Sequence, residues 1–237
     1  MFNIIYHYKN IIKLFYLHFK LIFLIKYILY LFQKKIIQLV YKKKIKELKE
    51  LYSKGLYSFD WASGNIHNFL TIQKIKKLDT NIKKFKILEI GSFEGYSANI
   101  LNKIFPGCEI YCIDSWSSYS ELANIDFNQI ENNFDSNTRN LNIKKFKMSS
   151  NIFFKINKEF FDIIYIDGAH DYESVLSDAN NSIKILRKNG IIFFDDFIGD
   201  DVNKNKVMNA IKFFLDSNLS VNLELIFLNS QIRFRLN

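Results

Sequence analysis

Short apolar runs alternate with amphipathic segments through the second half of the chain. Residues 161–166, FDIIYI, are rich in β-branched and aromatic side chains, which is typical of a strand buried on both faces. After a polar loop, residues 172–188 carry apolar side chains at helical spacing, and Asn189 and Gly190 are residues that often end a helix. A second apolar run, 191–194, stops at two aspartates. The pattern predicts a strand–helix–strand unit with parallel strands.

The same alternation occurs upstream of this unit, and two apolar runs around a polar turn end the chain. Together they predict an α/β fold: a doubly wound, Rossmann-like sheet that is mostly parallel and closes with a C-terminal antiparallel hairpin. The other predicted elements are strands at 85–90, 110–113 and 143–148, helices at 72–78, 96–105, 152–158 and 200–215, and hairpin strands at 223–227 and 232–236.

The first 54 residues differ from the rest of the chain in charge. Residues 1–54 hold 12 Lys and 2 Glu, a net charge of +10, whereas residues 55–237 hold 21 Lys+Arg and 22 Asp+Glu, a net charge of −1. We therefore predict a basic, hydrophobic helical arm at 1–54 and a globular domain at 55–237. Because that domain is nearly neutral, nucleic-acid binding is not expected.

The arm has three interpretations that the sequence leaves open. Residues 11–32 are long enough to span a bilayer, but lysines interrupt them and Lys20 falls near the centre. An amphipathic helix on a membrane surface or a partner fits the lysine stripe, and the basic run 42–46 would attract anionic lipid. The third interpretation is a helix packed on the domain or on a second copy of the chain. We expect a cytoplasmic protein with peripheral contact to the inner membrane surface, and self-association stays open.

A glycine turn follows the strand predicted at 85–90. Gly91 and Gly95 would let the backbone approach a ligand closely, and Asp114, at the end of the next strand, is placed to bind a ribose diol. A dinucleotide-binding fold would carry G-x-G-x-x-G here, but the segment reads E-x-G-x-x-x-G and has Phe93 where the pyrophosphate would approach. This segment resembles the first motif of the class I S-adenosylmethionine-dependent methyltransferases.

That resemblance implies a binding site for S-adenosyl-L-methionine. Glu89 would bond the turn or the methionine amine, the backbone of 91–95 would follow the methionyl part, and Asp114 would take the ribose hydroxyls. A buried glutamate without a partner would be costly, which also favours a functional role for Glu89. The predicted cofactor-binding residues are Glu89, Gly91, Ser92, Gly95, Asp114 and Ser115.

Acidic residues and one histidine follow the two strands of the unit described first. Because the carboxyl ends of parallel strands share one edge of a sheet, we expect Asp167, His170, Asp195 and Asp196 to converge. Three adjacent carboxylates repel one another, and a divalent cation such as Mg²⁺ or Mn²⁺ would remove that repulsion. Such an ion lowers the pKa of a substrate hydroxyl, and histidine is a common general base near neutral pH. The alternative is that these groups only cap strand ends.

A narrower resemblance rests on D-G-x-H after one strand and D-D after the next. This pattern is similar to that of the metal-dependent sugar O-methyltransferases of macrocin O-methyltransferase type, in methyltransferase family 24. The resemblance implies that Asp167, Asp195 and Asp196 hold the metal and that His170 takes the hydroxyl proton. It implies O-methylation of a sugar, a glycan or a related small molecule. The alternatives are a metal-independent methyltransferase for another nucleophile and a non-catalytic, membrane-tethered scaffold.

Some residues near this edge have two interpretations each. Trp61, Asn65 and His67 either cover a ligand or belong to a segment packed on the sheet. Trp116 either stacks on the adenine or packs in the core, and the serines at 149–150 either bond the adenine or cap a helix. Residues 115–140 are polar and poorly periodic, so we expect them to cross the edge above the site.

Overall fold

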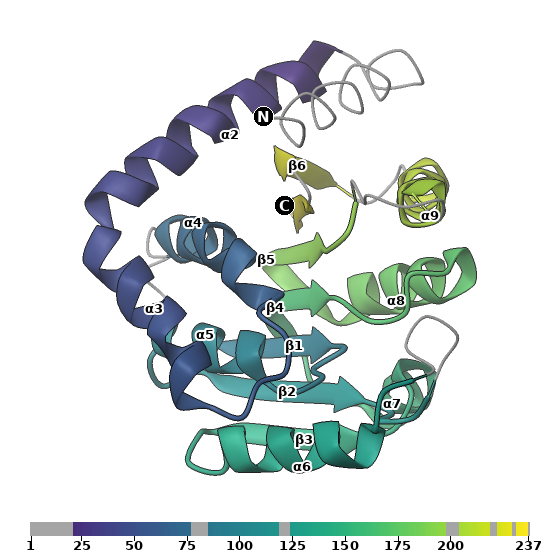
Figure 1. The fold of residues 1–237 in the computed structure, drawn as a ribbon. Helices are drawn as coiled ribbons and strands as arrows, with labels where there is room; N and C mark the ends of the chain where they lie inside the picture. The colour runs from purple at the N-terminus through teal and green to yellow at the C-terminus, as the bar shows by residue number, and fades with distance from the viewer. Residues whose placement is uncertain are drawn as a thin grey trace.

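The computed structural model describes residues 21–76, 85–118, 124–197, 204–218, 222–228 and 231–236. Within these ranges seven strands form one sheet, in the order β3-β2-β1-β4-β5-β7-β6 (Figure 1). The strands β1 to β5 pair in parallel, and β7 runs antiparallel to both β5 and β6. The predicted fold class is therefore confirmed. The strands are β1 (Lys86–Ile90), β2 (Glu109–Asp114), β3 (Ile143–Lys147), β4 (Phe161–Ile166), β5 (Leu186–Phe194), β6 (Leu223–Leu228) and β7 (Ile232–Leu236).

Helices cover both faces of the sheet, because successive strand residues point to opposite sides. On β4, for example, Tyr165 belongs to the apolar cluster under α4 and α5, whereas Ile164 belongs to the cluster under α8 and α9. The helices are α2 (Leu21–Val40), α3 (Lys42–Lys54), the 3₁₀ turn η1 (Ala62–Asn65), α4 (Ile66–Lys76), α5 (Tyr96–Ile104), α6 (Phe127–Thr138), α7 (Ser150–Ile156), α8 (Tyr172–Ile185) and α9 (Lys204–Ser217).

The described part of the arm packs on the domain. Tyr30 and Ile37 of α2 and Leu48 of α3 are buried, and α2 lies beside β6 and α4. For residues 21–54 the structure thus agrees with the interpretation of a helix packed on the domain. The first part of the stretch at 11–32 lies outside the described residues. In the ranges that the structure describes, no helix is both long enough and apolar enough to cross a membrane.

One predicted boundary is wrong. The sequence predicts a helix to residue 188 that Asn189 and Gly190 end, but α8 ends at Ile185, and β5 includes both residues. Leu186 is buried and pairs with Phe161 of β4. Long-range pairing thus outweighs the local helix-ending signal, and Asn189 adopts its left-handed backbone, φ +60°, inside an irregular strand instead.

Two other helices, those predicted at 72–78 and at 152–158, begin earlier than expected. The predicted helix 72–78 begins earlier, at Ile66, and continues directly from η1, while residues 77–78 lie outside the described part. The helix predicted at 152–158 spans Ser150–Ile156. For the helix predicted at 200–215, residues 200–203 lie outside the described part, and the expected apolar face of Lys204–Ser217 is buried on the sheet. Neither difference moves the carboxyl ends of the parallel strands, where the candidate site lies.

Candidate active site

A cavity of about 760 Å³ opens at the carboxyl ends of the parallel strands. It is walled by the turn after β1, the ends of β2 and β3, and the loops after β4 and β5. The predicted site residues that line it are Gly91, Asp114, Ser115, Asp167, His170, Asp195 and Asp196. Three others are not among its lining residues: Glu89 is fully buried in β1, and Ser92 and Gly95 belong to the turn itself.

The turn after β1 needs glycine for a reason that the sequence did not reveal. Gly91 has φ +87°, and a Cβ there would lie 2.0 Å from the carbonyl oxygen of Asp167. Its amide donates to Ile113 O at 2.8 Å, and the Asp167 amide donates to Ile90 O at 2.8 Å. The close neighbour of this glycine is therefore the end of β4. The glycine turn and the loop after β4, residues 167–171 (the acidic loop), thus form one wall of the cavity.

Glu89 supports the turn from below. Its side chain is fully buried, and the Cys112 thiol donates to its Oε2 at 3.4 Å. Burial raises the pKa of Glu89 to about 7, although the hydroxyls of Ser97 and Ser92 act in the opposite direction. Contact with a methionine amine stays a prediction for this residue.

Asp114 braces the turn at the cavity wall. Its Oδ2 accepts from the Phe93 amide at 3.0 Å, and its Oδ1 accepts from the Trp116 amide at 2.8 Å. Burial raises the pKa of this carboxyl, and the backbone amides partly offset the effect. Trp116 is buried, donates from Nε1 to Phe93 O at 2.9 Å and packs on Phe134. For Trp116 the packing interpretation is therefore the one that the structure supports.

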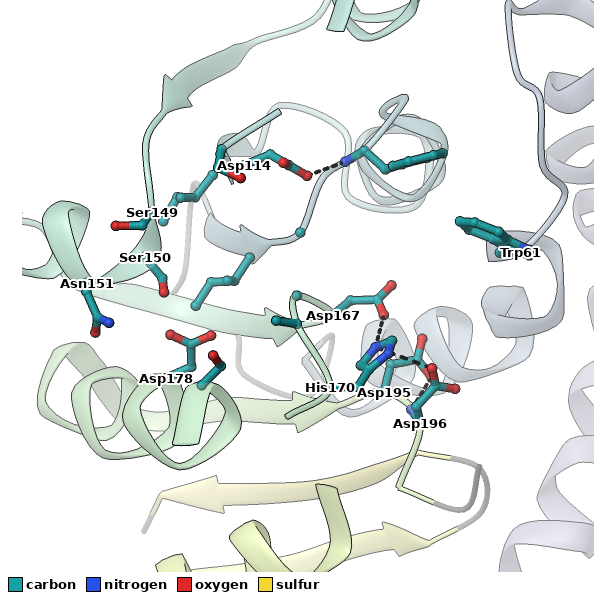
Figure 2. Close-up of a pocket in the computed structure, with 18 of the residues that line it drawn as sticks. Trp61, Asp114, Ser149, Ser150, Asn151, Asp167, His170, Asp178, Asp195 and Asp196 are labelled. Atoms are coloured by element: carbon teal, nitrogen blue, oxygen red, sulfur yellow. Dashed lines mark hydrogen bonds and ion pairs between the residues drawn. The ribbon is translucent and has the colours of Figure 1, made fainter. Parts of the chain in front are cut away.

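The structure brings the three predicted acids and the histidine together (Figure 2). His170 Nε2 lies 3.3 Å from Asp196 Oδ2 and 3.9 Å from Asp167 Oδ1. The Tyr165 hydroxyl bonds Asp167 Oδ2 at 2.8 Å and makes a short contact with Asp195 Oδ2. Burial and, next, the neighbouring Asp195 carboxylate together raise the pKa of Asp167 to about 8. The roles of these residues stay predictions.

The donor chemistry of this cluster fits a divalent cation. Carboxylate oxygens are the ligands that Mg²⁺ and Mn²⁺ prefer, and the Tyr165 hydroxyl holds the carboxylates of Asp167 and Asp195 close together. Within the described ranges, however, no three acidic, imidazole or thiol side chains already form a closed coordination set. The residues therefore suit a cation by type, whereas their spacing in this structure is not that of a metal site.

A buried polar chain behind the acids was missed from the sequence. Asn65 of η1 donates to Asp195 Oδ2 at 2.6 Å, and Asn68 of α4 donates to Gln231 Oε1 at 2.8 Å. Arg233 of β7 is fully buried and also donates to Gln231 Oε1, at 3.0 Å. Burial lowers the pKa of Arg233 to about 10. Tyr165, which bonds the acids, was also missed, although the sequence holds a signal for it. Residues two apart on a strand share a face, so Tyr165 is directed to the same side as Asp167.

The segment before α4 contributes to the cavity only in part. Trp61 and Asn65 line it, and Trp61 stacks on Phe59 with ring centroids 4.3 Å apart. His67 is not among the lining residues; burial, Lys34 and Lys49 lower its pKa to about 4. From the segment 115–140, Ser115 and Phe127 line the cavity, and residues 119–123 lie outside the described part.

Comparisons with known proteins agree with this geometry. Residues 88–197 match the model of a family described as a methyltransferase domain. The match begins in β1 and ends just after the Asp195–Asp196 pair, so it contains the glycine turn and all four residues of the acidic cluster. This segment of the chain is therefore similar to methyltransferase domains.

An uncharacterized protein of Acanthamoeba polyphaga mimivirus is 31% identical over 113 residues, which are 46% of this chain and 50% of the relative. The chain thus spans about half the length of the curated relative that it matches.

Solved structures share the fold of the methyltransferase domain at low identity. A Staphylococcus aureus protein provisionally described as a caffeoyl-CoA O-methyltransferase has a TM-score of 0.57 and 15% identity, covering 86% of this chain and 98% of its own. A Bacillus cereus O-methyltransferase in complex with S-adenosylhomocysteine has a TM-score of 0.52, 16% identity and the same coverage. The methyltransferase MycE of the mycinamycin pathway, solved with Mg and S-adenosylhomocysteine, has a TM-score of 0.53 and 16% identity, covering 80% of this chain and 54% of its own.

Proposed function

We propose that the chain transfers a methyl group from S-adenosylmethionine to a hydroxyl of a sugar, a glycan or a related small molecule, with help from a divalent cation. One observation carries the proposal. A single cavity joins the glycine turn and Asp114 to the cluster of Asp167, His170, Asp195 and Asp196. A methyl donor held on the first side would face a hydroxyl held on the second.

On the donor side, the turn and Asp114 set the position of the cofactor. The Asp114 carboxylate is already fixed by two backbone amides, so ribose hydroxyls would meet an oriented acceptor. Ser115 lies beside it on the cavity wall. Glu89, which lies under the turn, would keep its backbone in place.

On the acceptor side, Asp167, Asp195 and Asp196 would hold the cation, whose chemistry there is to lower the pKa of the substrate hydroxyl. His170 Nε2 faces the same group of oxygens and would accept the hydroxyl proton. The hydroxyl oxygen would then form the new bond to the methyl carbon as the bond from carbon to sulfur breaks. Asp196, 3.3 Å from the imidazole, would stabilise its protonated form.

Two findings support the assignment of the metal. The structural neighbour MycE was solved with Mg and S-adenosylhomocysteine, and the donor set here suits the same ion. The second candidate is a metal-independent transfer, which one observation favours: Tyr165 and Asn65 already supply hydrogen bonds to the acids without any cation. A chelator distinguishes the two candidates, because it should stop metal-assisted transfer and leave metal-independent transfer unchanged.

The test uses the purified full chain, labelled S-adenosylmethionine and a panel of nucleotide sugars and oligosaccharides. We expect label transfer that EDTA abolishes and Mg²⁺ restores. His170→Ala should abolish transfer but keep cofactor binding, whereas His67→Ala, which replaces a histidine away from the cavity, should keep both. Transfer that survives EDTA would support the metal-independent candidate, and transfer that survives His170→Ala would refute the role of this residue.

A further inference from the structure

The helix α8 presents a buried carboxyl group to the cavity, apart from the metal-site acids. Asp178 is 3% exposed and lines the cavity. Among the described residues its Oδ1 has no hydrogen-bond partner, although the Ser150 hydroxyl bonds the same carboxyl group. Leaving a buried acceptor unmatched is costly, so such a group in a cavity wall points to a donor on a ligand.

The surroundings of Asp178 suit a flat ring. Figure 2 shows Asp178 beneath Ser150 and Asn151, well away from His170 and Asp195. The apolar side chains of Ile90 and Ile113 belong to the same cavity. The loop after β4 passes close by, since a Cβ on Gly168 would lie 3.9 Å from Asp178 Oδ2. A cavity wall that combines apolar side chains with a carboxylate acceptor fits a heteroaromatic ring that carries an amine.

The order of groups along the cavity indicates which part of the proposed cofactor would lie beside Asp178. The acidic cluster marks the end where the methyl group reacts, and Asp114 marks the ribose. Asp178 and Ser150 border the remaining part, where the base of the proposed cofactor would lie. We propose that Asp178, together with Ser150, receives the exocyclic amine of adenine and so selects adenine against a 6-oxo purine. This inference rests on the proposed function.

Calorimetry on the full chain with two ligands tests it. S-Adenosylhomocysteine carries the amine, and S-inosylhomocysteine carries a carbonyl oxygen at the same position. The wild-type chain should prefer the adenosyl ligand by roughly 10- to 100-fold, the usual effect of leaving one buried polar group unmatched. Asp178→Asn keeps the shape and adds a donor for the carbonyl, so it should remove or reverse the preference. Ser150→Ala, a milder change, should reduce it.

Asp162→Asn is the matched control, because Asp162 is also a buried acid but bonds Arg187 and the Lys86 amide outside the cavity. Its preference should equal that of the wild type. If the wild type binds neither ligand, the proposed function itself fails. If the wild type binds and discriminates but Asp178→Asn and Ser150→Ala leave the ratio unchanged, only the assignment of Asp178 is overturned.

A second inference comes from the outer face of α2. Seven of its apolar side chains are between 44% and 79% exposed. At 3.6 residues per turn they fall within about 120° of the helix circumference, a continuous stripe, whereas the buried Tyr30 and Ile37 lie on the opposite face. The residues of this stripe are Ile25, Ile28, Leu29, Phe32, Ile36, Leu39 and Val40.

Charge complementarity indicates what covers the stripe. Lys35, Lys42, Lys43 and Lys46 are exposed beside or just beyond it, and residues 21–54 hold nine Lys against two Glu. Two copies of so basic a surface would repel each other, whereas anionic lipid attracts lysines and accepts an apolar helix face. We propose that α2 lies on a bilayer surface that contains anionic lipid.

Co-sedimentation of the full chain with vesicles tests this surface. Binding to phosphatidylglycerol-containing vesicles should exceed binding to pure phosphatidylcholine by at least tenfold, since each lysine near such a surface contributes about fivefold. Phe32→Glu with Ile36→Glu should abolish it, whereas Phe213→Glu, at a comparably exposed site on α9, should not. S-Adenosylhomocysteine binding reports whether the variants are folded.

Two outcomes would overturn this assignment. The first is a wild-type chain that stays in the supernatant when anionic vesicles sediment, as expected if another segment of the chain covers the stripe. The second is a dimer in light scattering that Phe32→Glu dissociates, because the partner would then be a second copy.

Discussion

Substitution of Gly91 tests whether the glycine turn after β1 and the acidic loop after β4 form one wall of the cavity. Gly91 has φ +87°, and a Cβ would meet the Asp167 carbonyl oxygen at 2.0 Å. Gly107 is the matched control, because its φ of +79° is similar but a Cβ there meets nothing within 4 Å. The pair separates the cost of a left-handed backbone from the cost of the clash.

The expected magnitudes follow from these two geometries. A left-handed backbone costs an L-residue about 1 to 2 kcal/mol, which is all that Gly107→Ala should lose. Gly91→Ala adds overpacking against a hydrogen-bonded backbone, about 1 to 3 kcal/mol more. At about 2 to 4 °C per kcal/mol for a chain of this size, the melting temperature should fall by about 2 to 8 °C at Gly107 and clearly further at Gly91.

The assay combines thermal unfolding with calorimetry of S-adenosylhomocysteine. Gly91→Ala should weaken binding at least tenfold, because Asp167 and the turn must move apart, whereas Gly107→Ala should stay within about twofold of the wild type. Equal losses of stability for the two variants, with binding unchanged in both, would refute the idea of a shared wall.

Three further changes have defined outcomes. Glu89 has a folded-state pKa of about 7 against 4.5 in the unfolded chain, so its ionisation weakens the folded state as pH rises from 4.5 to 7. Glu89→Gln should therefore gain stability relative to the wild type between pH 5 and pH 8, by up to about 3 kcal/mol in urea titrations; a constant difference would contradict this. Tyr165→Phe removes the hydroxyl shared by Asp167 and Asp195 and should cost about 1 to 3 kcal/mol of unfolding free energy, with S-adenosylhomocysteine affinity retained; an equally stable variant would refute the bridging role. Saturating Mg²⁺ should raise the melting temperature of the wild type but not of Asp195→Asn, and equal shifts would place the ion elsewhere.

The fold was readable from the sequence because its signals are local and strong. The run at 161–166 gives a strand buried at every position, and the glycine turn after 85–90 fixes where α5 begins. Parallel topology then places Asp167 and Asp195 at one edge without further information. The end of α8 was not readable, because Leu186 joins the sheet through its pairing with Phe161.

Other parts of the site depend on contacts between distant segments. Asp178 appears in the sequence as one polar position of an amphipathic helix, and only packing shows that it is buried in the cavity. Arg233 looks like an outward residue of a terminal hairpin, yet it is fully buried beside Gln231. Asn65 reaches Asp195 across 130 positions of sequence, and no local pattern encodes that contact.

Binding of S-adenosylhomocysteine to the purified full chain tests the central claim most directly. Titration calorimetry should show one site per chain with micromolar-scale affinity, and Asp114→Ala, which removes the carboxylate from the cavity wall, should weaken it strongly. A wild-type chain that gives no heat with this ligand, but binds a nicotinamide dinucleotide instead, would contradict the account.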